Sequence, residues 1–185
     1  MLVFQYGSNC TGARLNAAER LNGRAQDLGA ARSVDAFDLA FDIYSQKNGC
    51  AAADIVGGAG RQVWGVLFEI PEDFVLGRRA DRQRTLAQIE GSLYEPVNVR
   101  VRRPGASEDE SATTFTVRAS ERRRGVWTST EYVGYIVRGL RAHGVPEDYV
   151  LYVIERAVAA NHAADSHSAI ETRGIDSLRE PGPAT

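Results

Sequence analysis

Stretches of alternating apolar and polar residues predict a sheet in this chain. Residues 37–42 and 97–102 place an apolar side chain at every second position, which is typical of half-buried strands. The run 2–6 is short, apolar and aromatic, and the run 63–70 is apolar on both faces, which places the latter at the centre of the sheet. We expect strands at residues 2–6, 37–42, 51–56, 63–70, 97–102 and 114–117.

Helical patterns separate these strands. Apolar residues on one face predict a helix that begins at Ser8 or Asn9 and ends near residue 21, and another that begins at Ser129. A polar helix is expected over residues 79–89, and a last one over 147–165. This order of elements predicts an α+β fold.

Length and composition are consistent with one domain. The chain has 185 residues, and we assign residues 1–165 to the domain. Residues 166–185 are small and polar, with prolines near the end, so we expect a loosely held C-terminal tail.

Charge and cysteine content narrow the function classes. A net charge of −2 predicts no nucleic-acid partner, and the apolar runs are too short to span a bilayer, so no membrane partner is expected. Two cysteines, Cys10 and Cys50, are too few for a thiolate metal cluster, and no metal is expected. The first residues do not resemble a secretory signal. We expect a soluble, reduced, cytoplasmic protein.

The segment Tyr6-Gly7-Ser8-Asn9 is the first candidate site. It joins a strand to a helix through a glycine, and backbone N–H groups at such a junction can bind a carboxylate or an oxyanion. An ordinary capped turn has the same pattern. Cys10 follows near a helix N-terminus, where a thiol can be activated, although a small buried residue is the commoner role.

Glu90 is the candidate for acid–base chemistry. It lies between the apolar Ile89 and a glycine, where partial burial would raise its pKa towards the range of a general base. A solvated glutamate at a helix end is the alternative. Tyr132, in the segment that starts at Ser129, is either a core residue or part of a site.

Taken together and in order, these segments resemble the gamma-glutamyl cyclotransferase-like superfamily, which includes the avirulence-induced plant proteins. The resemblance runs from about Met1 to Val153. It rests on the segments Phe4-Gln5-Tyr6-Gly7-Ser8-Asn9, Phe37 to Phe41, Gln62-Val63-Trp64-Gly65-Val66-Leu67-Phe68, Leu86 to Gly91, Tyr94 with the alternating valines that follow, and Ser129 to Tyr149.

The resemblance implies a small mixed β-barrel flanked by helices and a reaction that needs no cofactor. The α-amine of a γ-glutamyl group attacks its own γ-carbonyl, which releases 5-oxoproline and an amine or amino acid. By resemblance Glu90 is the general acid and base, and the backbone of Tyr6, Gly7, Ser8, Asn9 and Cys10 binds substrate oxygens, while Tyr132 and Tyr94 line the glutamyl pocket. The implied partner is a small γ-glutamyl compound.

Departures from the family pattern leave several points open. Cys10 stands where relatives usually carry leucine, and Ala87 replaces an aspartate often found near the glutamate. A Cys10-dependent amidase or transferase and a non-catalytic binding protein therefore remain alternatives. The leaving group and the oligomeric state, a homodimer included, are also open.

Overall fold

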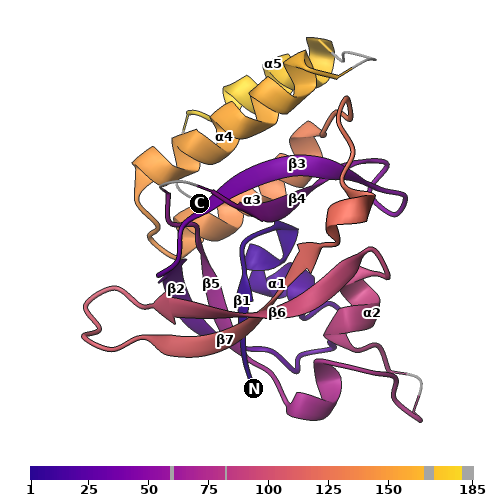
Figure 1. Ribbon diagram of the computed structural model, residues 1–185, viewed down its shortest axis with the longest axis vertical. Helices are drawn as coiled ribbons and strands as arrows, with labels where there is room; N and C mark the ends of the chain where they lie inside the picture. The colour runs from indigo at the N-terminus through magenta and orange to yellow at the C-terminus, as the bar shows by residue number, and fades with distance from the viewer. Residues whose placement is uncertain (59–60, 82, 165–168, 181–185) are drawn as a thin grey trace.

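The computed structural model describes residues 1–58, 61–81, 83–164 and 169–180 (Figure 1). Five strands close into a small barrel in the order β1-β5-β2-β6-β7. Neighbouring strands are antiparallel except β1 and β7, which meet in parallel at Val3 and Thr113, so the barrel is mixed. The barrel strands are β1 (Leu2–Gln5), β2 (Gln26–Ser33), β5 (Trp64–Glu69), β6 (Tyr94–Arg102) and β7 (Glu110–Val117).

The strand β5 pairs with β1 on one side and β2 on the other, and the burial expected for both of its faces is confirmed. Its residues 65–68 are buried. In β6 the alternation is also confirmed: Val99 and Val101 are buried, whereas Asn98 and Arg100 are exposed. One face of this strand therefore packs into the barrel.

A separate two-stranded sheet lies between the barrel and the helix α4 (Glu147–His162; Figure 1). It consists of β3 (Phe37–Ser45) and β4 (Cys50–Gly57), which form an antiparallel hairpin. Figure 1 shows α4 running along the side of this hairpin that faces away from the barrel, and α4 contacts β3.

The helix α3 (Thr130–Ala142) begins as predicted, with the Ser129 hydroxyl accepting a hydrogen bond from the Tyr132 N–H. Its buried residues recur three and four positions apart and pack towards the interior, so the helix contacts both β5 and the loop after β1.

Two predicted helices are wrong in extent. The chain after β1 forms a 3-10 helix, η1 (Ser8–Cys10), and then only one turn of α-helix, α1 (Gly12–Leu15), because Asn16 caps the turn and residues 17–23 turn back on it. Likewise α2 covers only Leu86–Glu90. Thr85 starts it with a reciprocal capping box, in which its side chain and Gln88 satisfy each other's backbone N–H groups.

The tail that we expected to be loosely held contains an ordered helix. Residues Ala169–Ser177 form α5, which packs against α3 and α4 and buries Ile175 completely. The prediction is wrong for this segment, because one apolar residue per turn was too weak a signal to reveal its packing. Residues 166–168 and 181–185 of the predicted tail lie outside the described part.

The remaining elements are two short 3-10 helices, η2 (Glu72–Phe74) and η3 (Ala119–Glu121). Within the described ranges, no helix has the length and apolar character needed to cross a membrane.

Candidate active site

The site centres on Glu90, the last residue of α2. Gly91 ends the helix with a φ of 99°, a left-handed conformation that favours glycine, so the chain turns away and leaves the carboxylate at the cleft. Glu90 Oε1 accepts a hydrogen bond of 2.9 Å from Asn9 Nδ2. This bond joins the end of α2 to the loop after β1, and its two residues are 81 positions apart in the chain.

Burial raises the pKa of Glu90 above the usual glutamate range. The charge of Arg20 acts in the opposite direction, as do the hydrogen bonds from Asn9 and Gln5 and the charge of Lys47. The carboxylate is therefore held by donors but remains more basic than one in water, which is the condition for a proton acceptor near neutral pH.

Asn9 is fixed from both sides. Its Nδ2 group donates to Glu90, while its Oδ1 atom accepts a hydrogen bond from the guanidinium of Arg20. Arg20 is buried and lies in the turn after α1. The chain of hydrogen bonds from Arg20 through Asn9 to Glu90 therefore sets the orientation of the carboxylate and places a positive charge on the far side of Asn9.

Three tyrosines surround the other side of Glu90. The Tyr6 hydroxyl donates to the Phe115 carbonyl at 2.5 Å, and the Tyr94 hydroxyl donates to the Ala53 carbonyl at 2.9 Å. The Tyr132 hydroxyl instead accepts the Ala53 N–H at 3.0 Å and also interacts with the Ser8 side chain. Burial raises the pKa of all three hydroxyls, to about 12 for Tyr132, and they stay protonated at neutral pH.

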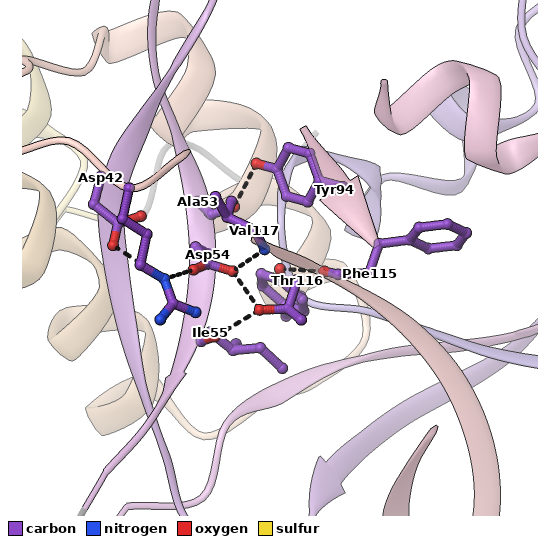
Figure 2. A network of polar contacts seen from close by, with 10 residues as sticks. Asp42, Ala53, Asp54, Ile55, Tyr94, Phe115, Thr116 and Val117 are labelled. Atoms are coloured by element: carbon purple, nitrogen blue, oxygen red, sulfur yellow. Dashed lines mark hydrogen bonds and ion pairs between the residues drawn. The ribbon is translucent and has the colours of Figure 1, made fainter. Parts of the chain in front are cut away.

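The backbone at Ala53 is held by a buried aspartate beside it. Figure 2 shows Asp54 of β4 facing β7, where one carboxylate oxygen accepts hydrogen bonds of 2.8 Å from the Thr116 hydroxyl and the Val117 N–H. The other oxygen accepts from Arg122 at 2.9 Å. Asp54 is fully buried, so this network joins the hairpin to the barrel and fixes the residue to which Tyr94 and Tyr132 bind.

Two connected cavities meet at Glu90. An inner pocket of about 30 Å³ lies against the barrel, and an outer cleft of about 640 Å³ opens from it. Ser8, Asn9, Glu90, Tyr94 and Tyr132 line both, whereas Tyr6 and Gly7 line the inner pocket alone. The structure thus brings together every sequence-predicted site residue except Cys10.

Cys10 lies outside both cavities. Its side chain is fully buried, its thiol donates to the Gln5 carbonyl, and burial raises the pKa of the thiol above its usual range. The Cys10 N–H, which we had expected to bind a substrate oxygen, donates to the Gly7 carbonyl at 3.0 Å because it closes the 3-10 turn. Ser8 and Asn9 precede that first bond, so their N–H groups have no acceptor inside the turn.

Gly7 has an ordinary extended φ of −97°. A Cβ atom added there would lie 3.5 Å from the Tyr132 hydroxyl, which is normal contact distance. The glycine therefore leaves room in the inner pocket, and backbone strain is not the reason for it.

Sequence reasoning missed the basic side chains of the outer cleft. They come from five separate segments and follow no period, so no local pattern could reveal them. These residues are Arg14, Arg20, Lys47, Arg84 and Arg123. Among the described residues, no three or more His, Cys, Asp or Glu side chains form a group that could hold a metal ion.

Comparison with known proteins supports the reading of the fold. Residues 62–153 match the AIG2-like family. A solved structure named gamma-glutamyl cyclotransferase is 20% identical, with a TM-score of 0.67 over 96% of this chain and 98% of that one. The fold expected from the resemblance is confirmed, and the family match over residues 62–153 agrees with that resemblance.

Two further solved structures agree. An uncharacterized protein from Homo sapiens is 20% identical, with a TM-score of 0.68 over 97% of this chain and 98% of that one. YkqA from Bacillus subtilis is 20% identical, with a TM-score of 0.66 over 90% of this chain and 56% of that one. At this identity the likenesses show the fold alone. The comparison with curated proteins gives no match.

Proposed function

We propose that this protein is a gamma-glutamyl cyclotransferase-type enzyme in which Glu90 is the general acid and base. The observation that carries the proposal is the position of the Glu90 carboxylate, with its raised pKa, where the inner pocket and the outer cleft meet. One carboxylate at such a junction reaches both the glutamyl part of a substrate and its leaving group.

The reaction suits a site with few charged groups near the reacting atoms. The α-ammonium of the γ-glutamyl group gives a proton to Glu90, and the free amine attacks the γ-carbonyl to form a five-membered ring. The ring nitrogen then loses a second proton, the leaving nitrogen gains one, and the old C–N bond breaks. The released amine then takes up the other proton and becomes an ammonium ion, so no proton is consumed overall. The nucleophile and the electrophile belong to the same glutamyl group, and this tether supplies their proximity.

The inner pocket supplies neutral donors for oxygens of the glutamyl group, of which a pocket of about 30 Å³ receives a part while the rest lies in the cleft. The N–H groups of Ser8 and Asn9 are suited to substrate oxygens, the developing oxyanion included. The Tyr132 hydroxyl lines the same pocket and, as a donor as well as an acceptor, can turn its proton towards a substrate oxygen. The pocket therefore stabilises negative charge without a metal ligand set.

A thiol mechanism is disfavoured by the position of Cys10. A nucleophile must reach the substrate as a thiolate, but the Cys10 sulfur is buried outside both cavities and its pKa is raised. The non-catalytic alternative keeps the same pocket and differs only in the absence of turnover.

The test is 5-oxoproline release by the purified protein from a panel of γ-glutamyl compounds with varied leaving groups. Release that depends on Glu90 supports the proposal. A folded protein that binds these compounds by calorimetry but releases no 5-oxoproline would establish the binding-protein alternative instead.

A further inference from the structure

The outer cleft is strongly basic although the whole chain carries a net charge of −2. Five basic side chains line it, against the carboxylates of Glu90 and Glu121. The inner pocket contains no lysine or arginine. Positive charge is thus concentrated on the side of Glu90 that faces away from the glutamyl pocket.

These cleft cations lack the ion pairs that several arginines on the outer surface form. On the outer surface Arg79, Arg100, Arg102, Arg103 and Arg141 each form an ion pair with a carboxylate. Within the described part of the chain, none of the cleft cations lies within ion-pair distance of a carboxylate. The five cations of the cleft are Arg14, Arg20, Lys47, Arg84 and Arg123.

Two of the cleft guanidinium groups have buried donors without a partner. The Nε atoms of Arg14 and Arg20 are inaccessible to solvent and have no hydrogen-bond acceptor among the described residues. Arg20 is more than nine-tenths buried, and only its Nη2 atom has a protein acceptor, Asn9. A buried charged donor is costly to leave unpaired, and the positive charge of these two groups at the cleft would favour a bound anion.

The cations also repel one another. Burial and the charges of Arg14 and Arg84 lower the pKa of Arg20, and burial and the charges of Arg20, Arg84 and Arg14 lower that of Lys47. The charge of Glu19 raises the pKa of both Arg20 and Lys47, and the charge of Glu90 raises that of Arg20. Lys47 is the single lysine of the chain, and it stands in the turn of the β3–β4 hairpin above this cluster.

We propose that the outer cleft selects γ-glutamyl compounds whose leaving group carries more than one negative charge, such as an acidic amino acid or a short acidic peptide. This inference rests on the proposed function, which puts the leaving nitrogen beside Glu90 and the leaving group in the cleft. One carboxylate of such a group pairs with the Arg14–Arg20 side and a second with Lys47 and Arg84. A neutral amine leaves all of these cations unpaired.

The test compares two dipeptides that differ only in one carboxylate, γ-glutamyl-glutamate and γ-glutamyl-glutamine. The ratio of their kcat/KM values for 5-oxoproline release should favour the glutamate compound by about tenfold or more at low salt, and should shrink as salt screens the cleft. Equal or reversed values in an active protein would overturn the inference and leave the proposed function standing.

A double variant, Lys47→Gln with Arg84→Gln, should bring the ratio close to one. Arg100→Gln, which removes an exposed charge on β6, is the control and should keep the parent ratio. A ratio unchanged in the double variant contradicts the assignment of these two residues. The salt dependence on the parent protein tests the same claim without any variant.

Calorimetry separates this inference from the proposed function. If no compound releases 5-oxoproline, the function fails, but the two dipeptides can still be titrated into the parent protein. Tighter binding of the glutamate compound, lost in the double variant, would sustain the anion-selective cleft, whereas equal or undetectable binding of both would overturn it.

Discussion

At the scale of single residues, Tyr132 has two separable tasks. Its hydroxyl accepts the buried Ala53 N–H, and it faces the inner pocket. Tyr132→Phe should therefore lose about 1–3 kcal/mol of unfolding free energy, because the N–H is left unpaired, and it should also weaken turnover. Urea unfolding and steady-state kinetics measure the two effects.

Tyr152→Phe is a matched control for Tyr132→Phe. The Tyr152 hydroxyl accepts the Leu39 N–H at 3.3 Å in the same way, but it lies outside both cavities. It should lose stability and keep parental kinetics. Identical kinetics for the two variants would make Tyr132 a packing residue only.

Cys10 should be dispensable for chemistry. Cys10→Ala removes a small buried side chain and one thiol hydrogen bond, so we expect a loss of about 1 kcal/mol in stability and turnover within about twofold of the parent. Cys50→Ala, the other buried cysteine, serves as the control. A loss of turnover at Cys10 alone, on the scale expected for a general base, would revive the thiol mechanism.

The site residues found from sequence are those that stand in a local pattern. Tyr6 to Asn9 follow a strand and Glu90 precedes a glycine, and the resemblance of these segments, in their order along the chain, to a known family singled them out. Arg20 and Lys47 could not be found in this way, because only the folded chain brings a turn after α1 and a hairpin tip to one cleft. The role of the Cys10 N–H was wrong, since it depended on a turn type that the sequence did not specify.

At the scale of elements, the packing of α3 on η1 positions the loop of the site. A Cβ atom on Gly139 would lie 2.6 Å from the Cys10 carbonyl carbon and 2.8 Å from the Thr11 nitrogen, so the helix and the loop backbone touch there. Gly139→Ala should push η1 away, at a cost of about 1–3 kcal/mol, and should raise KM for a γ-glutamyl substrate.

Gly134→Ala in the same helix provides the contrast. There the added Cβ would meet only the mobile end of Arg138 at 3.0 Å, and alanine favours helix over glycine by up to about 1 kcal/mol. This variant should keep its KM and its stability. An unchanged KM in Gly139→Ala as well would show that the contact does not position the loop.

Elements with a strong period were predictable, and those fixed by tertiary contacts were not. The alternation in 97–102 and the helical face of α3 both identified real elements. In contrast, β2 was missed because Gln26–Ser33 mixes polar and small residues and carries a bulge between Asp27 and Gly29. The strand exists because β5 and β6 supply its hydrogen-bond partners.

At the scale of the whole molecule, buried carboxylates link stability to pH. Burial and the nearby Asp54 carboxylate raise the pKa of Asp42 to about 6, and its Oδ1 atom is buried without a hydrogen-bond partner. A raised pKa means that the folded state favours the protonated acid. The stability from this group is therefore present below about pH 4 and is lost as the pH rises through about 6.

Asp42→Asn should therefore be more stable than the parent at pH 7, by about 1–2 kcal/mol, with the difference vanishing near pH 4. Urea unfolding between pH 4 and 8 measures this. Asp35→Asn removes an exposed carboxylate paired with Arg100 and should give no such gain. A parent more stable than Asp42→Asn at pH 7 would show that attraction to Arg122 outweighs the burial of the charge.

The account as a whole depends on Glu90, because it is the carboxylate that lines both the inner pocket and the cleft. Glu90→Gln keeps the shape of the side chain but cannot accept a proton, so turnover should fall about a hundred- to ten-thousand-fold. The stability of the variant at neutral pH should not fall. A neutral amide avoids the free-energy cost of burying a negative charge, which is the cost that raises the pKa of Glu90. Glu121→Gln, the other carboxylate of the cleft, is the matched control and should retain turnover.

The most direct measurement pairs 5-oxoproline release with calorimetric binding of a γ-glutamyl compound on one preparation of Glu90→Gln. The account predicts that turnover is lost on the stated scale while binding stays within a few-fold of the parent, because the loop Tyr6–Asn9 and the tyrosines are unchanged. Full turnover in a folded Glu90→Gln protein would contradict it.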